Sequence, residues 1–131
     1  MASKQVLVMR KFIGKGSRIG KYVAQGAHAS VGALFSLGAI DKEAKEFVID
    51  ISNPFVYEWV VGNFRKITCY VETDQELTDI YIAARSAGIA CSIIEDSGLT
   101  EFNGVKTLTA IGVGPADEEL INKLTGHLPL F

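Results

Sequence analysis

Residues 14–28 read GKGSRIGKYVAQGAH and follow a short apolar run, VLVM, at residues 6–9. The order of apolar run, glycine-rich turn and helix-forming segment predicts a strand that leads into a helix. The turn carries three cations, Lys15, Arg18 and Lys21. A helix N-terminus offers unpaired backbone N–H groups and the positive end of the helix dipole. This stretch therefore predicts a site for an anion, above all a phosphate.

The composition indicates one soluble domain with an uneven distribution of charge. The chain has 131 residues, of which 48% are hydrophobic and 21% charged, typical of a globular domain with one core. We expect a single domain over residues 1–131, in the cytoplasm, without a signal peptide or a membrane span. Residues 1–40 contain six Lys or Arg and no acid, whereas residues 41–131 contain seven bases and fifteen acids. This asymmetry favours a local anion site over ordinary solvated charge.

The hydrophobic pattern predicts alternating strands and helices. Strands are expected at residues 5–10, 66–71, 90–95 and 107–112, and helices at residues 21–37, 54–64, 74–87 and 117–125. Residues 46–51 fit either a short strand or the end of a helix. We expect an α/β fold, a three-layer α/β/α sandwich with a mixed, mostly parallel four-stranded sheet. Both cysteines fall in expected strands and are interpreted as core thiols.

The first expected helix has two informative faces. Its core stripe is predicted from helical spacing to consist of Val23, Ala27, Val31 and Leu34. Lys21, Gln25 and His28 form a second, polar stripe. The helix is also rich in Gly and Ala, which permits either the close approach of a ligand or tight packing on the sheet.

Known nucleotide and nucleophile motifs do not fit the chain. A Walker A loop ending at Gly20-Lys21 would need Gly at residue 15 and Ser or Thr at residue 22, where Lys and Tyr stand. The dinucleotide pattern G-x-G-x-x-G fails at Ile19. The sequence has no G-x-S-x-G motif and no metal-ligand cluster, and His127 lies where a helix cap is expected. We therefore expect no metal and no cofactor.

A set of polar residues is expected to meet at one edge of the sheet. Lys21, Gln25 and His28 lie on the first helix, Asp96 and Thr100 follow one strand, and Thr107 begins another. Parallel strands deliver such residues to the same carboxyl edge, where ligand sites of α/β sheets lie. The alternative is that Asp96 and Thr100 only shape a loop and that His28 is an ordinary helix residue.

Three stretches match motifs that occur together in one family. Residues 20–29 read GKYVAQGAHA, residues 96–100 read DSGLT, and the segment from Thr107 contains GPA at 114–116 and TGHL at 125–128. In order and spacing they resemble the motifs of the peptidyl-tRNA hydrolase type 2 family, the class found in archaea and eukaryotes. The resemblance covers most of the chain and is weak over residues 38–64. Here Ser17-Arg18-Ile19 are apparent extra residues, and Gly26-Ala27 replace the family's usual Cys-Ser.

The resemblance implies a homodimeric enzyme that cleaves the ester between a peptide and the 3′ end of tRNA. The residues that match the family's active site are Lys21, His28, Asp96, Thr100 and Thr107, with Gln25 close by. We expect direct attack by water, with Lys21 near the developing oxyanion and either Asp96 or His28 as the base. The residues expected to bind the substrate are Lys11, Lys15, Arg18, Gln25 and Gly98. The alternative is a non-catalytic module of the same fold that binds RNA or a protein; neither DNA nor a membrane is an expected partner.

Overall fold

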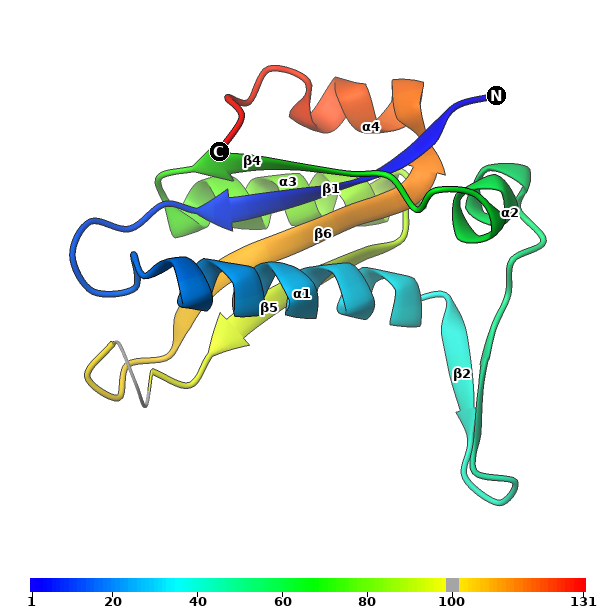
Figure 1. Ribbon diagram of the computed structural model, residues 1–131, viewed down its shortest axis with the longest axis horizontal. Coiled ribbons are helices and arrows are strands. Elements are labelled where there is room, and N and C mark those ends of the chain that lie inside the picture. The colour runs from blue at the N-terminus through cyan, green and yellow to red at the C-terminus, as the bar shows by residue number, and fades with distance from the viewer. Residues whose placement is uncertain (99–101) are drawn as a thin grey trace.

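A computed structural model describes residues 1–98 and 102–131 and shows an α/β protein built on a four-stranded sheet (Figure 1). The strands of this sheet are β1 (Ser3–Arg10), β4 (Lys66–Val71), β5 (Cys91–Asp96) and β6 (Thr107–Asp117), in the order β4-β1-β6-β5. The helices are α1 (Ile19–Phe35), α2 (Pro54–Val61), α3 (Asp74–Ser86) and α4 (Glu118–Thr125). A separate two-stranded hairpin consists of β2 (Gly38–Asp41) and β3 (Glu46–Ile49).

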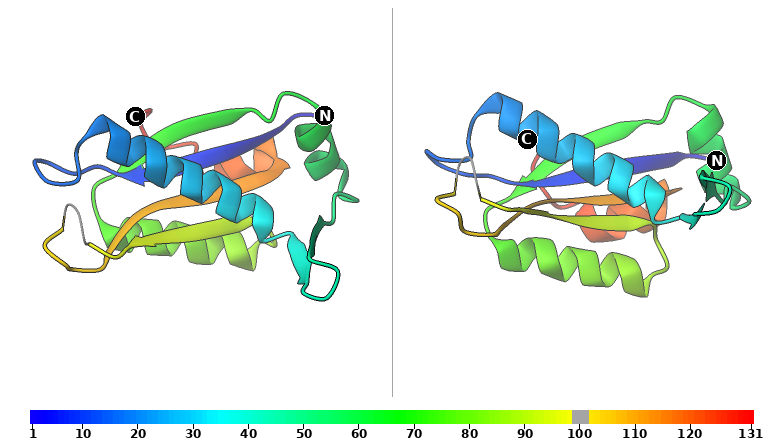
Figure 2. Two further views of the ribbon diagram at one scale, coloured as in Figure 1. Left: turned by 60° about the horizontal axis from the view of Figure 1, so that its bottom comes forward. Right: turned by 90° about the horizontal axis from the view of Figure 1, so that it is seen from below.

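The helices cover both faces of the sheet, which confirms the three-layer α/β/α arrangement. Helix α1 crosses one face, whereas α3 and α4 lie on the other (Figure 2). Helix α2 packs near the start of β1 and the end of β6 (Figure 1). Its first turn is capped by Asn53, whose side chain accepts hydrogen bonds from the backbone N–H groups of Phe55 and Val56.

The sheet is mixed, as expected, and the directions of its strands determine which strand ends lie together. Strands β1 and β4 pair in parallel, whereas β6 pairs antiparallel with both β1 and β5. Three strands therefore run in one direction, although only one of the three neighbouring pairs is parallel. The crossover through α3 carries the chain from β4 at one edge to β5 at the other. Because β1 and β5 share a direction, they end at the same side of the sheet.

Strand β1 is buried on both faces, as its apolar run predicts. Val6 and Val8 pack in the cluster that includes Leu77 of α3 and Ile121 of α4. Leu7 and Met9 alternate to the other face and pack with Ala29 of α1 in a second cluster. Cys69 and Cys91 are buried free cysteines, which confirms their interpretation as core thiols.

The prediction for the core stripe of α1 is wrong. Val23 and Val31 are 66% and 47% exposed, whereas the buried positions of the helix are Gln25, Gly26, Ala29 and Ala33. The small residues let the helix backbone come close to the sheet, where the Ser92 hydroxyl donates to the carbonyl oxygen of Ala29 at 2.7 Å. Gly26, Ala29 and Ala33 therefore serve tight packing on the sheet, whereas Val23 and Val31 are left at the surface.

Residues 38–49 form the hairpin and do not join the main sheet. Each residue of β2 pairs with a residue of β3, from Gly38 with Ile49 to Asp41 with Glu46. The hairpin projects away from the body next to the end of α1 (Figure 1), and the rings of Phe35 and Phe47 pack there with centroids 4.7 Å apart. Of the two sequence readings of residues 46–51, the strand is the correct one.

Candidate active site

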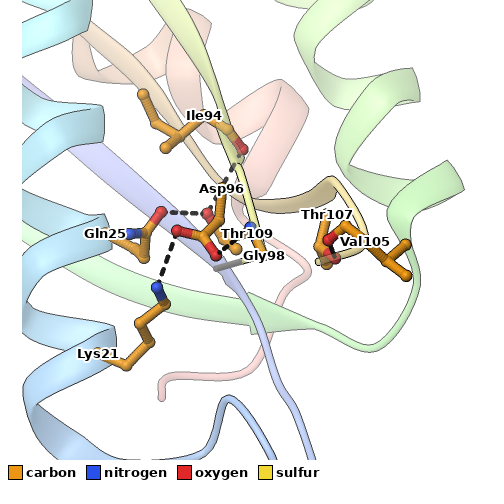
Figure 3. Close-up of polar contacts among 8 residues, drawn as sticks. All are labelled: Lys21, Gln25, Ile94, Asp96, Gly98, Val105, Thr107 and Thr109. Carbon is orange, nitrogen blue, oxygen red and sulfur yellow. Dashed lines mark hydrogen bonds and ion pairs between the residues drawn. The ribbon is translucent and has the colours of Figure 1, made fainter. Parts of the chain in front are cut away.

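Some of the polar residues singled out in the sequence, Lys21, Gln25 and Asp96, lie close together where β1 and β5 end and β6 begins. Helix α1 starts at the same side of the sheet, so Lys21 in its first turn lies near Asp96 at the end of β5 (Figure 3). Asp96 and Thr107 are direct neighbours in the register of β5 and β6. The expectation of a shared edge is therefore met by Lys21 and Asp96, which are separated by 75 positions in the chain.

Lys21 and Asp96 form an ion pair that is largely shielded from solvent. The Lys21 Nζ donates to Asp96 Oδ1 at 2.8 Å, and each side chain is only 15% exposed. The second carboxylate oxygen accepts a hydrogen bond from the backbone N–H of Gly98 at 3.0 Å. The pKa of Asp96 is held below its usual range, chiefly by the hydrogen bond from Lys21. Burial acts in the opposite direction. The hydrogen bond from Gly98 and the charges of Lys21 and His28 lower the pKa further. Asp96 is therefore a carboxylate at neutral pH.

Gly98 has a backbone that another residue would not tolerate. Its φ angle is +81°, and a Cβ atom there would lie 2.2 Å from the carbonyl oxygen of Val105. Gly98 lies against the backbone of Val105. From there its N–H donates to Asp96, and its carbonyl oxygen accepts from the N–H of Gly104 at 2.8 Å. The structure shows Gly98 as a donor to the Asp96 carboxylate; its role in substrate binding stays a prediction.

Thr109 is a site residue that the sequence interpretation missed. Its hydroxyl lies 2.5 Å from Gln25 Oε1 and 3.4 Å from the carbonyl oxygen of Ile94. Thr109 and Gln25 are only 2% and 6% exposed, and both lie beside Asp96 (Figure 3). Because the hydroxyl donates to Oε1, the amide oxygen of Gln25 is committed to Thr109 and its NH₂ group is the donor that remains. The signal in the sequence is the spacing of Thr107 and Thr109, which puts both on one side of a strand.

Thr107 lies apart from the Lys21–Asp96 pair, although its backbone adjoins Asp96. Its hydroxyl donates to the carbonyl oxygen of Val105 at 2.9 Å, within its own loop (Figure 3). His28 lies on α1 two turns after Lys21, is exposed, and contributes electrostatically to the low pKa of Asp96. The predicted site residue Thr100 lies outside the described residues.

The predicted substrate-binding cations surround the start of α1. Lys11, Lys15 and Arg18 are exposed in the loop between β1 and α1. Lys15 donates to Asn103 Oδ1 at 2.9 Å, and the Lys11 Nζ lies 4.9 Å from the centre of the Tyr70 ring. All three therefore lie in the loop that leads into α1, whose first turn carries Lys21.

The described part of the chain offers neither a metal centre nor a membrane-spanning helix. Residues 1–98 and 102–131 contain no group of three or more His, Cys, Asp or Glu side chains that could hold a metal ion. Within the same residues, every helix is too short or too polar to cross a membrane.

Comparison with known proteins identifies the family. Residues 3–131 match the family model described as peptidyl-tRNA hydrolase PTH2. A protein of Methanocaldococcus jannaschii named peptidyl-tRNA hydrolase is 42% identical over 129 residues, which cover 98% of this chain and 99% of the relative. A protein of the same name from Methanopyrus kandleri is 38% identical, over 98% of this chain and 97% of the relative. Another, from Thermococcus onnurineus, is 37% identical, over 97% of this chain and 96% of the relative. The chain therefore belongs to the peptidyl-tRNA hydrolase PTH2 family.

Proposed function

We propose that this protein hydrolyses the ester bond between a peptide, or an N-blocked amino acid, and the 3′ end of tRNA. The reaction would return tRNA to translation in the cytoplasm. The observation that carries the proposal is the shielded Lys21–Asp96 ion pair, formed between the two motifs that resemble the family's active site. A cation that is largely shielded from solvent and held beside an anion is the kind of preorganised charge that stabilises a developing oxyanion.

In the proposed mechanism, water attacks the ester carbonyl directly. Lys21 supplies positive charge to the oxyanion, and Asp96 holds the ammonium in position through the 2.8 Å contact. Either Asp96, although its lowered pKa makes it a weak proton acceptor, or His28 would take the proton from water. Gln25, oriented by Thr109, would direct its NH₂ group as a hydrogen-bond donor toward the substrate.

We propose that the basic loop binds the phosphates of the tRNA end. Lys11, Lys15 and Arg18 lie in one exposed loop on the same side of the sheet as Lys21. Cations in such a position release counterions when they bind a polynucleotide, so affinity falls as salt rises. The loop would hold the strand while the ester enters the site beside Lys21.

We also propose that the protein is a homodimer that uses the exposed apolar stripe of α1. The stripe consists of exposed residues that follow one another every four positions along the helix: Ile19, Val23, Ala27, Val31 and Phe35. A stripe of this kind at the surface is typical of a face covered by a partner. Sedimentation equilibrium should give twice the monomer mass for the wild type and a lower mass for Val23→Asp; a monomeric wild type would contradict this proposal.

The deciding experiment measures release of peptide from purified peptidyl-tRNA, with aminoacyl-tRNA that has a free amino group as the comparison substrate. The wild type should release the peptide. The runner-up, a non-catalytic module that binds RNA or a protein, would be supported by tight binding of the same RNA without any cleavage.

A further inference from the structure

An aromatic ring, Phe102, lies beside the ammonium group of the proposed active site, packs against a second ring, Phe12, and has no part in the mechanism above. Phe12 follows β1, and Phe102 lies in the loop that precedes β6. Their ring centroids are 4.9 Å apart, and the Lys21 Nζ lies 5.8 Å from the centre of the Phe102 ring. Both rings are half-buried. The Phe102 ring is therefore close enough to Lys21 for a single nucleotide to contact both residues.

The rings are held in place by contacts between their two loops. Lys15 joins the loops through its hydrogen bond to Asn103, next to Phe102. At Gly16, φ is +85° and a Cβ atom would lie 2.6 Å from Cε1 of Phe102, so only glycine allows the first loop to close against the ring. On the other side, the guanidinium carbon of Arg10 lies 4.9 Å from the centre of the Phe12 ring. The aromatic pair is thus positioned before any substrate arrives.

We propose that Phe102, backed by Phe12, is the surface on which the base of the 3′-terminal nucleotide packs. The inference rests on the proposed function, in which the scissile ester is attached to the ribose of that nucleotide. When the ester carbonyl is beside Lys21, the terminal base lies one ribose away, which matches the position of Phe102 next to the same ammonium. Proteins commonly hold single-stranded nucleotides by combining cations for the backbone with aromatic rings for the bases.

A purely structural role for Phe102 makes a different prediction. If the ring only packs the two loops together, its loss would reduce the hydrolysis of every ester substrate by the same factor. If the ring packs against the base, its loss would matter only for a substrate that carries a base. The two roles can therefore be separated by varying the substrate and the protein together.

The test uses two short RNAs that carry the same N-acetyl-aminoacyl ester at the 3′ end. One ends in adenosine, and the other ends in the same ribose without a base. The ratio of kcat/KM between the two substrates is measured for the wild type, for Phe102→Leu, which keeps apolar packing between the loops, and for Phe102→Ala. The wild type should prefer the adenosine substrate about 5-fold or more, the size expected for one stacked base. In Phe102→Ala the ratio should approach one, and Phe102→Leu should have an intermediate or equally low ratio.

The outcome is read from the ratio, so a general loss of activity in a variant does not obscure it. A ratio near one for the wild type, or a wild-type ratio that persists in both variants, overturns the inference while leaving ester hydrolysis intact. A wild type that hydrolyses neither substrate and also fails on peptidyl-tRNA contradicts the proposed function instead.

Discussion

Two ion pairs lie at opposite ends of the sheet and differ in their exposure to solvent and in their neighbouring residues. Lys21 and Asp96 meet where β1 and β5 end, with both side chains 15% exposed. Arg65 and Glu118 meet where β4 and α4 begin, with the side chains 48% and 31% exposed. Solvent screens the second pair, and such surface pairs contribute little to stability or binding. Shielding from solvent and neighbouring donors, rather than the ion pair alone, therefore make the Lys21–Asp96 end of the sheet the candidate site.

The neighbours of the two carboxylates sharpen this contrast. Asp96 accepts a second hydrogen bond, from Gly98, and lies beside the buried pair of Gln25 and Thr109. Glu118 has its pKa lowered mainly by the hydrogen bond from Arg65, in a solvent-exposed setting. The Asp96 end therefore offers fixed charges and donors to a reacting group where solvent screens them less.

The largest expected effect compares Asp96→Asn with Glu118→Gln. Each substitution removes one negative charge and keeps the shape of the side chain. Asp96→Asn should lower kcat for peptidyl-tRNA on the order of 100-fold, because Lys21 loses the charge that positions its ammonium. Glu118→Gln should leave kcat within about 2-fold of wild type. Equal activity of the two variants would show that the shielded pair has no special role.

A smaller effect is expected when the hydroxyl of Thr109 is removed. Thr109→Val keeps the shape of the side chain but leaves Gln25 Oε1 without its donor, so the amide loses its fixed orientation. We expect kcat to fall about 5- to 10-fold, and Thr109→Ser to restore most of it. Thr125→Val is the matched control, because Thr125 is a similarly buried threonine whose hydroxyl donates to Ile121 within α4. Comparable losses in both variants would point to a general packing effect.

The pairing of Lys21 with Asp96 could be predicted from the sequence, whereas the surroundings of the pair could not. An apolar run followed by a glycine-rich turn locates the start of α1, and Asp96 follows a second apolar strand, so strand direction brings both to one edge. Thr109 was missed because a buried threonine in a strand looks like an ordinary β-former. Its partner Gln25 belongs to a helix whose buried face could not be recognised from hydrophobicity.

Three features of the fold could not be predicted from the hydrophobic pattern, each for a physical reason. The buried face of α1 is made of small residues that lower its apparent hydrophobicity, while its exposed valines imitate a core stripe. The direction of β6 is not encoded in its apolar run, because antiparallel and parallel neighbours bury the same side chains. The hairpin of residues 38–49 is short and mostly exposed, so no core periodicity marks it.

The cations of the loop before α1 and of the hairpin should also respond differently to salt. Lys15→Ala should weaken tRNA binding modestly and reduce the slope of log affinity against log salt by about one. Lys42→Ala removes an exposed cation from the turn between β2 and β3, on the hairpin, and should leave the slope unchanged. Fluorescence anisotropy with labelled tRNA at several salt concentrations measures both slopes. Identical slopes for wild type and Lys15→Ala would remove the basic loop from the proposed tRNA contact.

The smallest expected effect concerns stability at acid pH. Because the pKa of Asp96 is lowered in the folded protein, its contribution is fully present above about pH 4, the unfolded value, and is lost as pH falls through the folded value. The free energies of unfolding of wild type and Asp96→Asn, measured in urea, should therefore differ more at pH 7 than at about pH 2.5. Glu118→Gln should show a weaker trend of the same sign that fades in high salt, since its ion pair is exposed. If the difference in unfolding free energy between wild type and Asp96→Asn is the same at both pH values, the shielded ion pair does not stabilise the fold, and its role is confined to the site.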